Sequence, residues 1–142
     1  MSLRVNGDKP LIIAVDFDGT CVTHEYPNVG KDIGAAPILK RLAEKGHKLM
    51  LWTMRGTRPQ NDRATLLEAV EWFNRNDVPL WGINQNPSQM ASGWSNSNKQ
   101  YANLYIDDAA LGAPLKRDNE LSDRPFIDWV EVERQLTEHG IL

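Results

Sequence analysis

The sequence predicts an α/β fold in which a parallel sheet is layered by helices. Apolar runs that suit buried strands alternate along the chain with segments whose apolar residues recur at helical spacing. Such alternation implies right-handed crossovers between parallel strands. The length of 142 residues fits one domain with a single core. We therefore expect residues 1–142 to form one domain.

The first third of the chain carries two expected strands and one helix. Leu11–Val15 is an apolar run that suits a strand buried on both faces. A polar segment over about 21–36, punctuated by proline and glycine, is expected to form a short flap. A helix is predicted from Pro37, which suits a first turn, until Gly46 ends it. Residues 47–52 then form the second expected strand.

The rest of the chain continues the alternation of helix and strand. A second helix, capped by Asn61 or Asp62, has an apolar face that ends at Phe73. The remaining expected segments, in order, are a strand over 78–83, an irregular loop over about 84–99, a strand over 101–106, a loop over 111–125 and a helix over 127–139.

Composition and charge argue against several function classes. The chain is 41% hydrophobic and 25% charged, and its net charge is -3, which suggests neither a nucleic-acid partner nor a membrane-binding surface. The lone Cys21 cannot form an intrachain disulfide and is expected to be a small buried hydrophobe in a reducing compartment. Leu11–Val15 is too short to span a bilayer, and no signal-peptide pattern precedes it. We expect a cytoplasmic protein.

Polar residues follow three of the expected strands at their carboxyl ends. Asp16 follows the first strand, Thr53 the second and Asp107 the last. Because these ends share one edge of a parallel sheet, where open α/β folds bind ligands, we expect the three side chains to converge. The candidate site residues are Asp16, Asp18, Thr53, Lys99, Asp107 and Asp108.

Several carboxylates with no His or Cys beside them favour a hard cation such as Mg²⁺ over zinc. A carboxylate is also a known nucleophile toward phosphorus. Because its charge repels a phosphate dianion, such a site needs positive charge, which the metal and Lys99 would supply. The Thr53 hydroxyl can hold phosphate oxygens, and Arg55 can contact substrate anions.

These residues carry a resemblance to a known family. Asp16–Thr20, with the sequence DFDGT, resembles the first motif of the haloacid dehalogenase superfamily, most of whose members are Mg²⁺-dependent phosphatases. Thr53 resembles the phosphate-binding Ser or Thr of the second motif, Lys99 the lysine of the third, and Asp107–Asp108 the acidic fourth motif. The motifs occur in family order and span residues 11–108.

The resemblance implies a role for each matching residue. Asp16 would be the nucleophile and hold Mg²⁺ through its other oxygen. Asp18 would be general acid and then general base, while its main-chain carbonyl binds the metal. Thr53 and Lys99 would hold the phosphoryl group. The pair Asp107–Asp108 would complete the metal site, and which of the two contacts the metal directly stays open.

The resemblance also implies a three-layer Rossmann-like fold, here without a cap domain. Family members insert the cap after the first motif or before the third-motif lysine, and here both gaps, 21–36 and 84–98, are too short for one. The expected partner is a phosphorylated small molecule, and a homo-oligomer could shield the open site. Nucleic acid is not expected, because the net charge is negative, whereas a basic patch is typical of proteins that bind it.

Each assignment has an alternative. Aspartates after a strand often form turns or caps. Thr53 can be a β-favouring residue at a strand end, and Lys99 and Arg55 can be solvent-facing charges. At the level of function, the alternative is a non-catalytic module that binds Mg²⁺ and phosphate. A receiver domain is excluded by motif order, since its acidic pair comes first and its lysine last.

Overall fold

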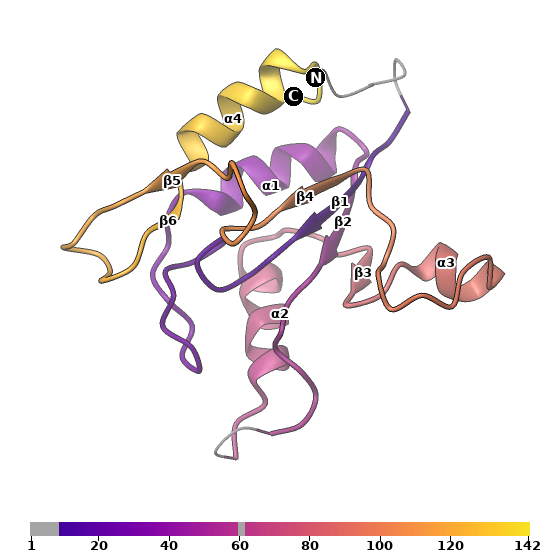
Figure 1. Cartoon of the computed structure of the whole chain (residues 1–142), viewed down its shortest axis with the longest axis horizontal. Coiled ribbons are helices and arrows are strands. Elements are labelled where there is room, and N and C mark those ends of the chain that lie inside the picture. The colour runs from indigo at the N-terminus through magenta and orange to yellow at the C-terminus, as the bar shows by residue number, and fades with distance from the viewer. Residues whose placement is uncertain (1–8, 60–61) are drawn as a thin grey trace.

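The computed structural model describes residues 9–59 and 62–142, which are built around a four-stranded parallel sheet (Figure 1). The strands are β1 (Ile12–Val15), β2 (Lys48–Leu51), β3 (Gly82–Ile83) and β4 (Leu104–Ile106). Their order is β3-β2-β1-β4, and each neighbouring pair is parallel. The predicted α/β class with a parallel sheet and flanking helices is confirmed.

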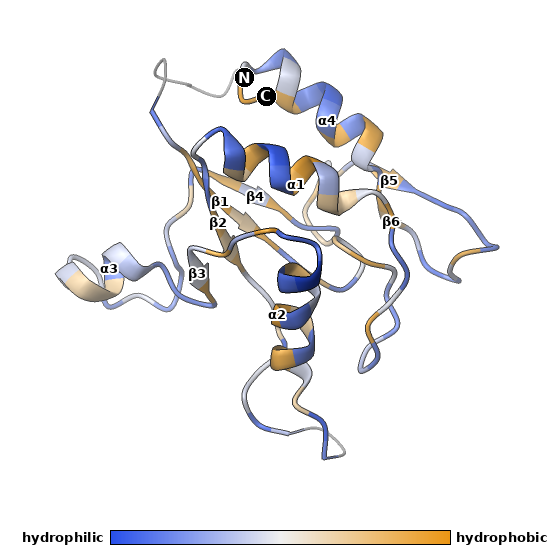
Figure 2. Cartoon of the chain, turned by 180° about the vertical axis from the view of Figure 1, so that it is seen from behind, coloured by the Kyte–Doolittle hydropathy of each residue, from blue (hydrophilic) through white to orange (hydrophobic). Residues whose placement is uncertain are grey.

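Three helices share one hydrophobic core with the sheet. The helices in the described part of the chain are α1 (Ala35–Glu44), α2 (Thr65–Arg75), α3 (Pro87–Ser92) and α4 (Trp129–Glu138). Val15 and Leu51 pack in one cluster with Leu39 of α1, Phe73 of α2 and Leu136 of α4. Helix α4 lies beside α1, and each of these helices carries polar and apolar stripes, as expected for amphipathic helices (Figure 2).

The segment between β3 and β4 contacts the other face of the sheet. Successive side chains of a strand point to opposite faces of the sheet. Met50 and Tyr105 both pair with Ala14, so their side chains point to this same face. The Tyr105 hydroxyl donates to the carbonyl of Gln100. Within the segment, buried Gln89 accepts from the Tyr101 N–H, and Gln100 accepts from the Asn86 N–H. The expected irregular loop therefore contains helix α3, which projects away from the sheet (Figure 1).

Several predicted boundaries differ from the structure. The third and fourth strands are shorter than 78–83 and 101–106. The loop expected over 111–125 contains β5 (Leu115–Lys116), which pairs antiparallel with β6 (Phe126–Ile127). The last helix consequently begins at Trp129, after Asp128 accepts from the backbone N–H groups of Val130 and Glu131. Pattern reasoning missed this two-stranded sheet because each strand has only two residues.

The second helix is capped differently from the prediction. It begins at Thr65 after Ala64, with no side-chain cap, so Asp62 does not have the expected capping role. Asn61 lies outside the described residues. Among the described residues, none of the helices has the length and apolar character needed to cross a bilayer.

Candidate active site

The carboxyl ends of β1, β2 and β4 bring the predicted residues together. Val15 pairs with both Leu51 and Ile106, and the Asp16 N–H donates to the Ile106 carbonyl at 3.0 Å. The residues after these strands therefore lie along one edge, as predicted. They line a cavity of about 480 Å³. The predicted residues in its wall are Asp16, Asp18, Thr53, Arg55, Asp107 and Asp108.

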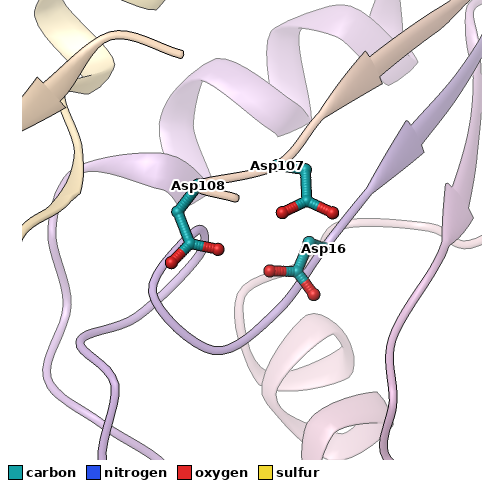
Figure 3. Close-up of side chains that lie close together, drawn as sticks. All are labelled: Asp16, Asp107 and Asp108. Carbon is teal, nitrogen blue, oxygen red and sulfur yellow. The ribbon is translucent and has the colours of Figure 1, made fainter. Parts of the chain in front are cut away.

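Three carboxylates form a cluster in this cavity (Figure 3). Asp16, Asp107 and Asp108 each offer one oxygen, and these oxygens lie within 4.8 Å of one another. Burial, the charge of Asp107 and contact with the Asp108 carboxyl raise the pKa of Asp16 to about 8. A bound cation would relieve this repulsion. An all-oxygen donor set fits a hard cation such as Mg²⁺.

Thr20 connects two of these carboxylates. Its hydroxyl lies 2.9 Å from Oδ2 of Asp16 and 3.3 Å from Oδ1 of Asp108, and it accepts from the Asp108 N–H at 3.1 Å. The indole N–H of Trp129 donates to the Thr20 carbonyl at 2.7 Å, so α4 also holds this turn. Sequence reasoning included Thr20 in the motif without assigning it a role. The structure shows that it orients the carboxylates.

Two features require glycine at position 19: a left-handed backbone and the close approach of Asp108. We predict that Gly19→Ala lowers both the stability of the protein and its affinity for Mg²⁺. Gly19 has φ +80°, and a Cβ there would lie 2.4 Å from Oδ2 of Asp108. The left-handed backbone alone should cost about 1–2 kcal/mol of unfolding free energy. The clash should also displace Asp108 and lower the affinity for Mg²⁺. Denaturant unfolding and calorimetric titration with Mg²⁺ measure the two effects.

Gly46→Ala is the matched control. Gly46 has φ +93°, and a Cβ there would meet no atom within 4 Å. It should show a similar loss of stability with unchanged Mg²⁺ affinity. Equal Mg²⁺ affinities in the two variants would contradict the assignment of Asp108 to the cluster.

Asn84 holds the turn that carries Thr53 and Arg55. Its side-chain oxygen accepts from the Thr53 N–H at 2.8 Å, and its side-chain N–H donates to the Arg55 carbonyl at 3.1 Å. Asn84 has φ 53°, a left-handed conformation that asparagine adopts more readily than most residues. The Thr53 hydroxyl accepts from the Arg55 N–H at 3.1 Å, which leaves its own proton to donate into the cavity.

Asp18 lies outside the three-carboxylate cluster because its side chain pairs with Arg55. The Arg55 Nε and Nη2 groups donate to Oδ2 and Oδ1 of Asp18 at 2.8 and 2.7 Å. Further N–H groups of Arg55 donate to the carbonyls of Thr65 and Asn28. We expected Arg55 to contact substrate anions. Instead its side chain is buried, and its hydrogen bonds are made within the protein.

Lys99 is not among the residues that line the cavity. It precedes β4, near the beginning of the strands, whereas the carboxylates follow the strand ends: the Asn103 N–H, for example, donates to the Ile12 carbonyl. The Lys99 ammonium lies 5.8 Å from the centroid of the Tyr105 ring, and the residue is exposed. Lys99 therefore does not lie where the resemblance implied, in the same cavity as Thr53 and the carboxylates.

Arg124 and His24 line the cavity, and sequence reasoning missed this role for both. Nη1 of Arg124 lies 3.3 Å from Nδ1 of His24. Arg124 reaches the site because it precedes β6, whose Ile127 N–H donates to the Gly19 carbonyl. A single arginine in a loop carries no sequence signal of this placement. Cys21 is fully buried, which confirms the prediction that it packs as a small hydrophobe.

The fold and the site define an α/β protein with a carboxylate cluster at the carboxyl edge of its parallel sheet. No family model matches the chain, and no curated protein matches it. Among solved structures, a conserved protein coded by a locus of Bacteroides thetaiotaomicron is 31% identical, with a TM-score of 0.69 over 92% of each chain. This chain belongs to the same protein family as that conserved protein.

Proposed function

We propose that the protein is a Mg²⁺-dependent phosphomonoester hydrolase of the haloacid dehalogenase type, without a cap domain. The observation that carries the proposal is the convergence of Asp16, Asp107 and Asp108 at one edge of the sheet, with Thr53 in the same cavity. Asp16 and either or both of Asp107 and Asp108 would hold Mg²⁺, which would neutralise phosphoryl charge when bound.

The proposed reaction has two steps. In the first, a carboxylate oxygen of Asp16 attacks phosphorus, the bond to the leaving oxygen breaks, and Asp18 donates a proton to that oxygen to form an alcohol. In the second, Asp18 accepts a proton from water as the water attacks phosphorus. The bond between phosphorus and Asp16 then breaks, which releases inorganic phosphate and restores both carboxyl groups. In both steps the Thr53 hydroxyl donates a hydrogen bond to a phosphoryl oxygen.

Arg124 replaces Lys99 in our proposal as the cation that faces the substrate. Arg55 is committed to Asp18, so its charge is already matched. The Arg124 side chain is exposed at the cavity wall, and within the part of the chain that the structure describes its hydrogen-bond contact is with Nδ1 of His24. The cavity of about 480 Å³ suits a phosphorylated small molecule rather than a polymer. A neighbouring copy of the chain could shield its open side.

The test is phosphate release from an aryl phosphate and from a panel of phosphorylated metabolites. We expect release with Mg²⁺ and none after chelation with EDTA. Restoration of activity by added Mg²⁺ distinguishes metal removal from denaturation. Release that continues unchanged in EDTA would contradict the proposed mechanism.

The absence of Lys99 from the cavity favours a second candidate, a non-catalytic module that binds Mg²⁺ and phosphate. Fewer cations around the phosphoryl group would slow turnover while leaving metal binding intact. Under this alternative, calorimetry detects Mg²⁺ binding but no compound in the panel releases phosphate. The same two measurements therefore decide between the candidates.

A further inference from the structure

A buried guanidinium lies between the proposed proton donor and the flap. The Arg55 side chain is 0% exposed, and that of Asp18 is 12% exposed. The Arg55 Cζ atom lies 5.0 Å from the centroid of the Phe17 ring and 5.2 Å from that of Tyr26. Two aromatic rings at this distance limit the movement of the guanidinium, so its hydrogen-bond partners are held with it.

The contact between Arg55 and Asp18 is bidentate. Each Asp18 oxygen accepts one N–H, at 2.8 Å from Nε and 2.7 Å from Nη2. Two parallel hydrogen bonds fix the plane of the carboxyl group as well as its position. Each oxygen keeps another lone pair, and Asp18 still lines the cavity. The pair therefore orients Asp18 without closing it off from a substrate.

The same guanidinium joins the turn that carries Asp18 to two further segments of the chain, the flap and the start of α2. Nη2 donates to the Asn28 carbonyl in the flap at 2.8 Å, and Nη1 donates to the Thr65 carbonyl at the start of α2 at 2.9 Å. The orientation of Asp18 is thus tied to the position of the flap and of α2. None of these contacts involves a side chain of the three-carboxylate cluster.

We infer that Arg55 is a positioning residue for proton transfer, which holds Asp18 where it can protonate the leaving oxygen. This inference rests on the proposed phosphatase function. As the bond between phosphorus and the leaving oxygen breaks, an alkoxide needs the proton from Asp18. A nitrophenolate is stable enough to depart without it. Loss of Arg55 should consequently slow the hydrolysis of alkyl phosphates much more than the hydrolysis of nitrophenyl phosphate.

The experiment compares kcat/KM for an alkyl phosphate and for p-nitrophenyl phosphate in wild type, Arg55→Lys and Arg55→Met. This parameter covers the steps up to transfer of the phosphoryl group to Asp16. General acid catalysis contributes about 10²–10⁴-fold to a rate. We therefore expect Arg55→Met to lower kcat/KM about 100-fold more for the alkyl phosphate than for p-nitrophenyl phosphate. Arg55→Lys, which keeps the charge but not the bidentate fork, should lose about 10-fold more.

The ratio of the two kcat/KM values does not depend on how much of the preparation is folded. A variant that folds poorly therefore still gives a valid result. In an Asp18→Asn background, Arg55→Lys should add no further selective loss, because the group that Arg55 positions is already gone.

Arg63→Lys is the matched control. Arg63 donates to the side chain of Asn28 in the same flap and pairs with Glu68, but it makes no hydrogen bond to Asp18. Its replacement should leave the ratio of the two substrates unchanged. A selective loss in this control as large as that in Arg55→Lys would overturn the inference, since any loosening of the flap would then explain it.

Two other outcomes distinguish a failure of this inference from a failure of the proposed phosphatase function. If wild type releases phosphate from both esters and the Arg55 variants lose equal factors on each, Arg55 is purely structural and the inference is wrong. If wild type releases phosphate from neither ester nor any compound of the panel, the proposed function is wrong and the inference falls with it.

Discussion

Asp16→Asn is expected to abolish phosphate release and, in the metal-free protein, to increase stability at pH 8. The amide cannot attack phosphorus, so we expect activity to fall at least about 10³-fold. The same change removes a partly buried charge that burial, the charge of Asp107 and contact with Asp108 all disfavour. A site built for catalysis is thus expected to reduce the stability of the fold. Steady-state kinetics and denaturant unfolding measure the two effects.

Asp77→Asn provides the control for Asp16→Asn. Asp77 is an exposed residue with φ 55°, a backbone conformation that asparagine also accepts, so the variant makes the same charge change at the surface. Activity should stay at the wild-type level. An Asp16→Asn variant as active as this control would exclude an aspartyl-phosphate on Asp16.

The stability of the metal-free protein is expected to fall as pH rises from about 4 to 8 because of Asp16. In the folded state this carboxyl keeps its proton up to a pKa of about 8. In the unfolded chain it loses the proton near pH 3.9. The folded state therefore binds more protons in this window, and the contribution of Asp16 to stability is lost at up to about 1.4 kcal/mol per pH unit.

Added Mg²⁺ should reverse this loss. Because the ligands must be ionised, Mg²⁺ affinity rises with pH, and the metal should raise the melting temperature more at pH 8 than at pH 5.5. Saturation at 100 times the dissociation constant would contribute about 2.7 kcal/mol. Calorimetric or fluorescence melting with Mg²⁺ and with EDTA gives the comparison. A Mg²⁺ shift that is equal at both pH values would argue against binding at Asp16.

The variants Asp107→Asn and Asp108→Asn show which residue contacts the metal directly. Replacement of the residue that binds Mg²⁺ directly should remove most of the Mg²⁺-induced rise in melting temperature. Replacement of a residue that binds through water should remove less of it. A rise that persists in full in both variants would place Mg²⁺ outside the three-carboxylate cluster.

Local patterns were sufficient for the parts of the fold that contain long elements. Leu11–Val15 is an unbroken apolar run, and helices α1 and α2 have apolar residues at helical spacing, so the fold class and the parallel sheet could be predicted. The hairpin of β5 and β6 could not, because two residues per strand carry no period. Helix α3 was missed because Met90 is the one large apolar side chain among its six residues, which leaves no helical period to detect.

The sequence by itself determined that carboxylates meet at one edge of a parallel sheet, because strand direction alone brings Asp16 and Asp107 together. Only the tertiary structure decided which cations join them. Arg55 turns inward to Asp18, Arg124 enters from the hairpin, and Lys99 lies over Tyr105. These side chains are long, and their positions depend on contacts between segments distant in sequence. Neither periodicity nor motif spacing contains that information.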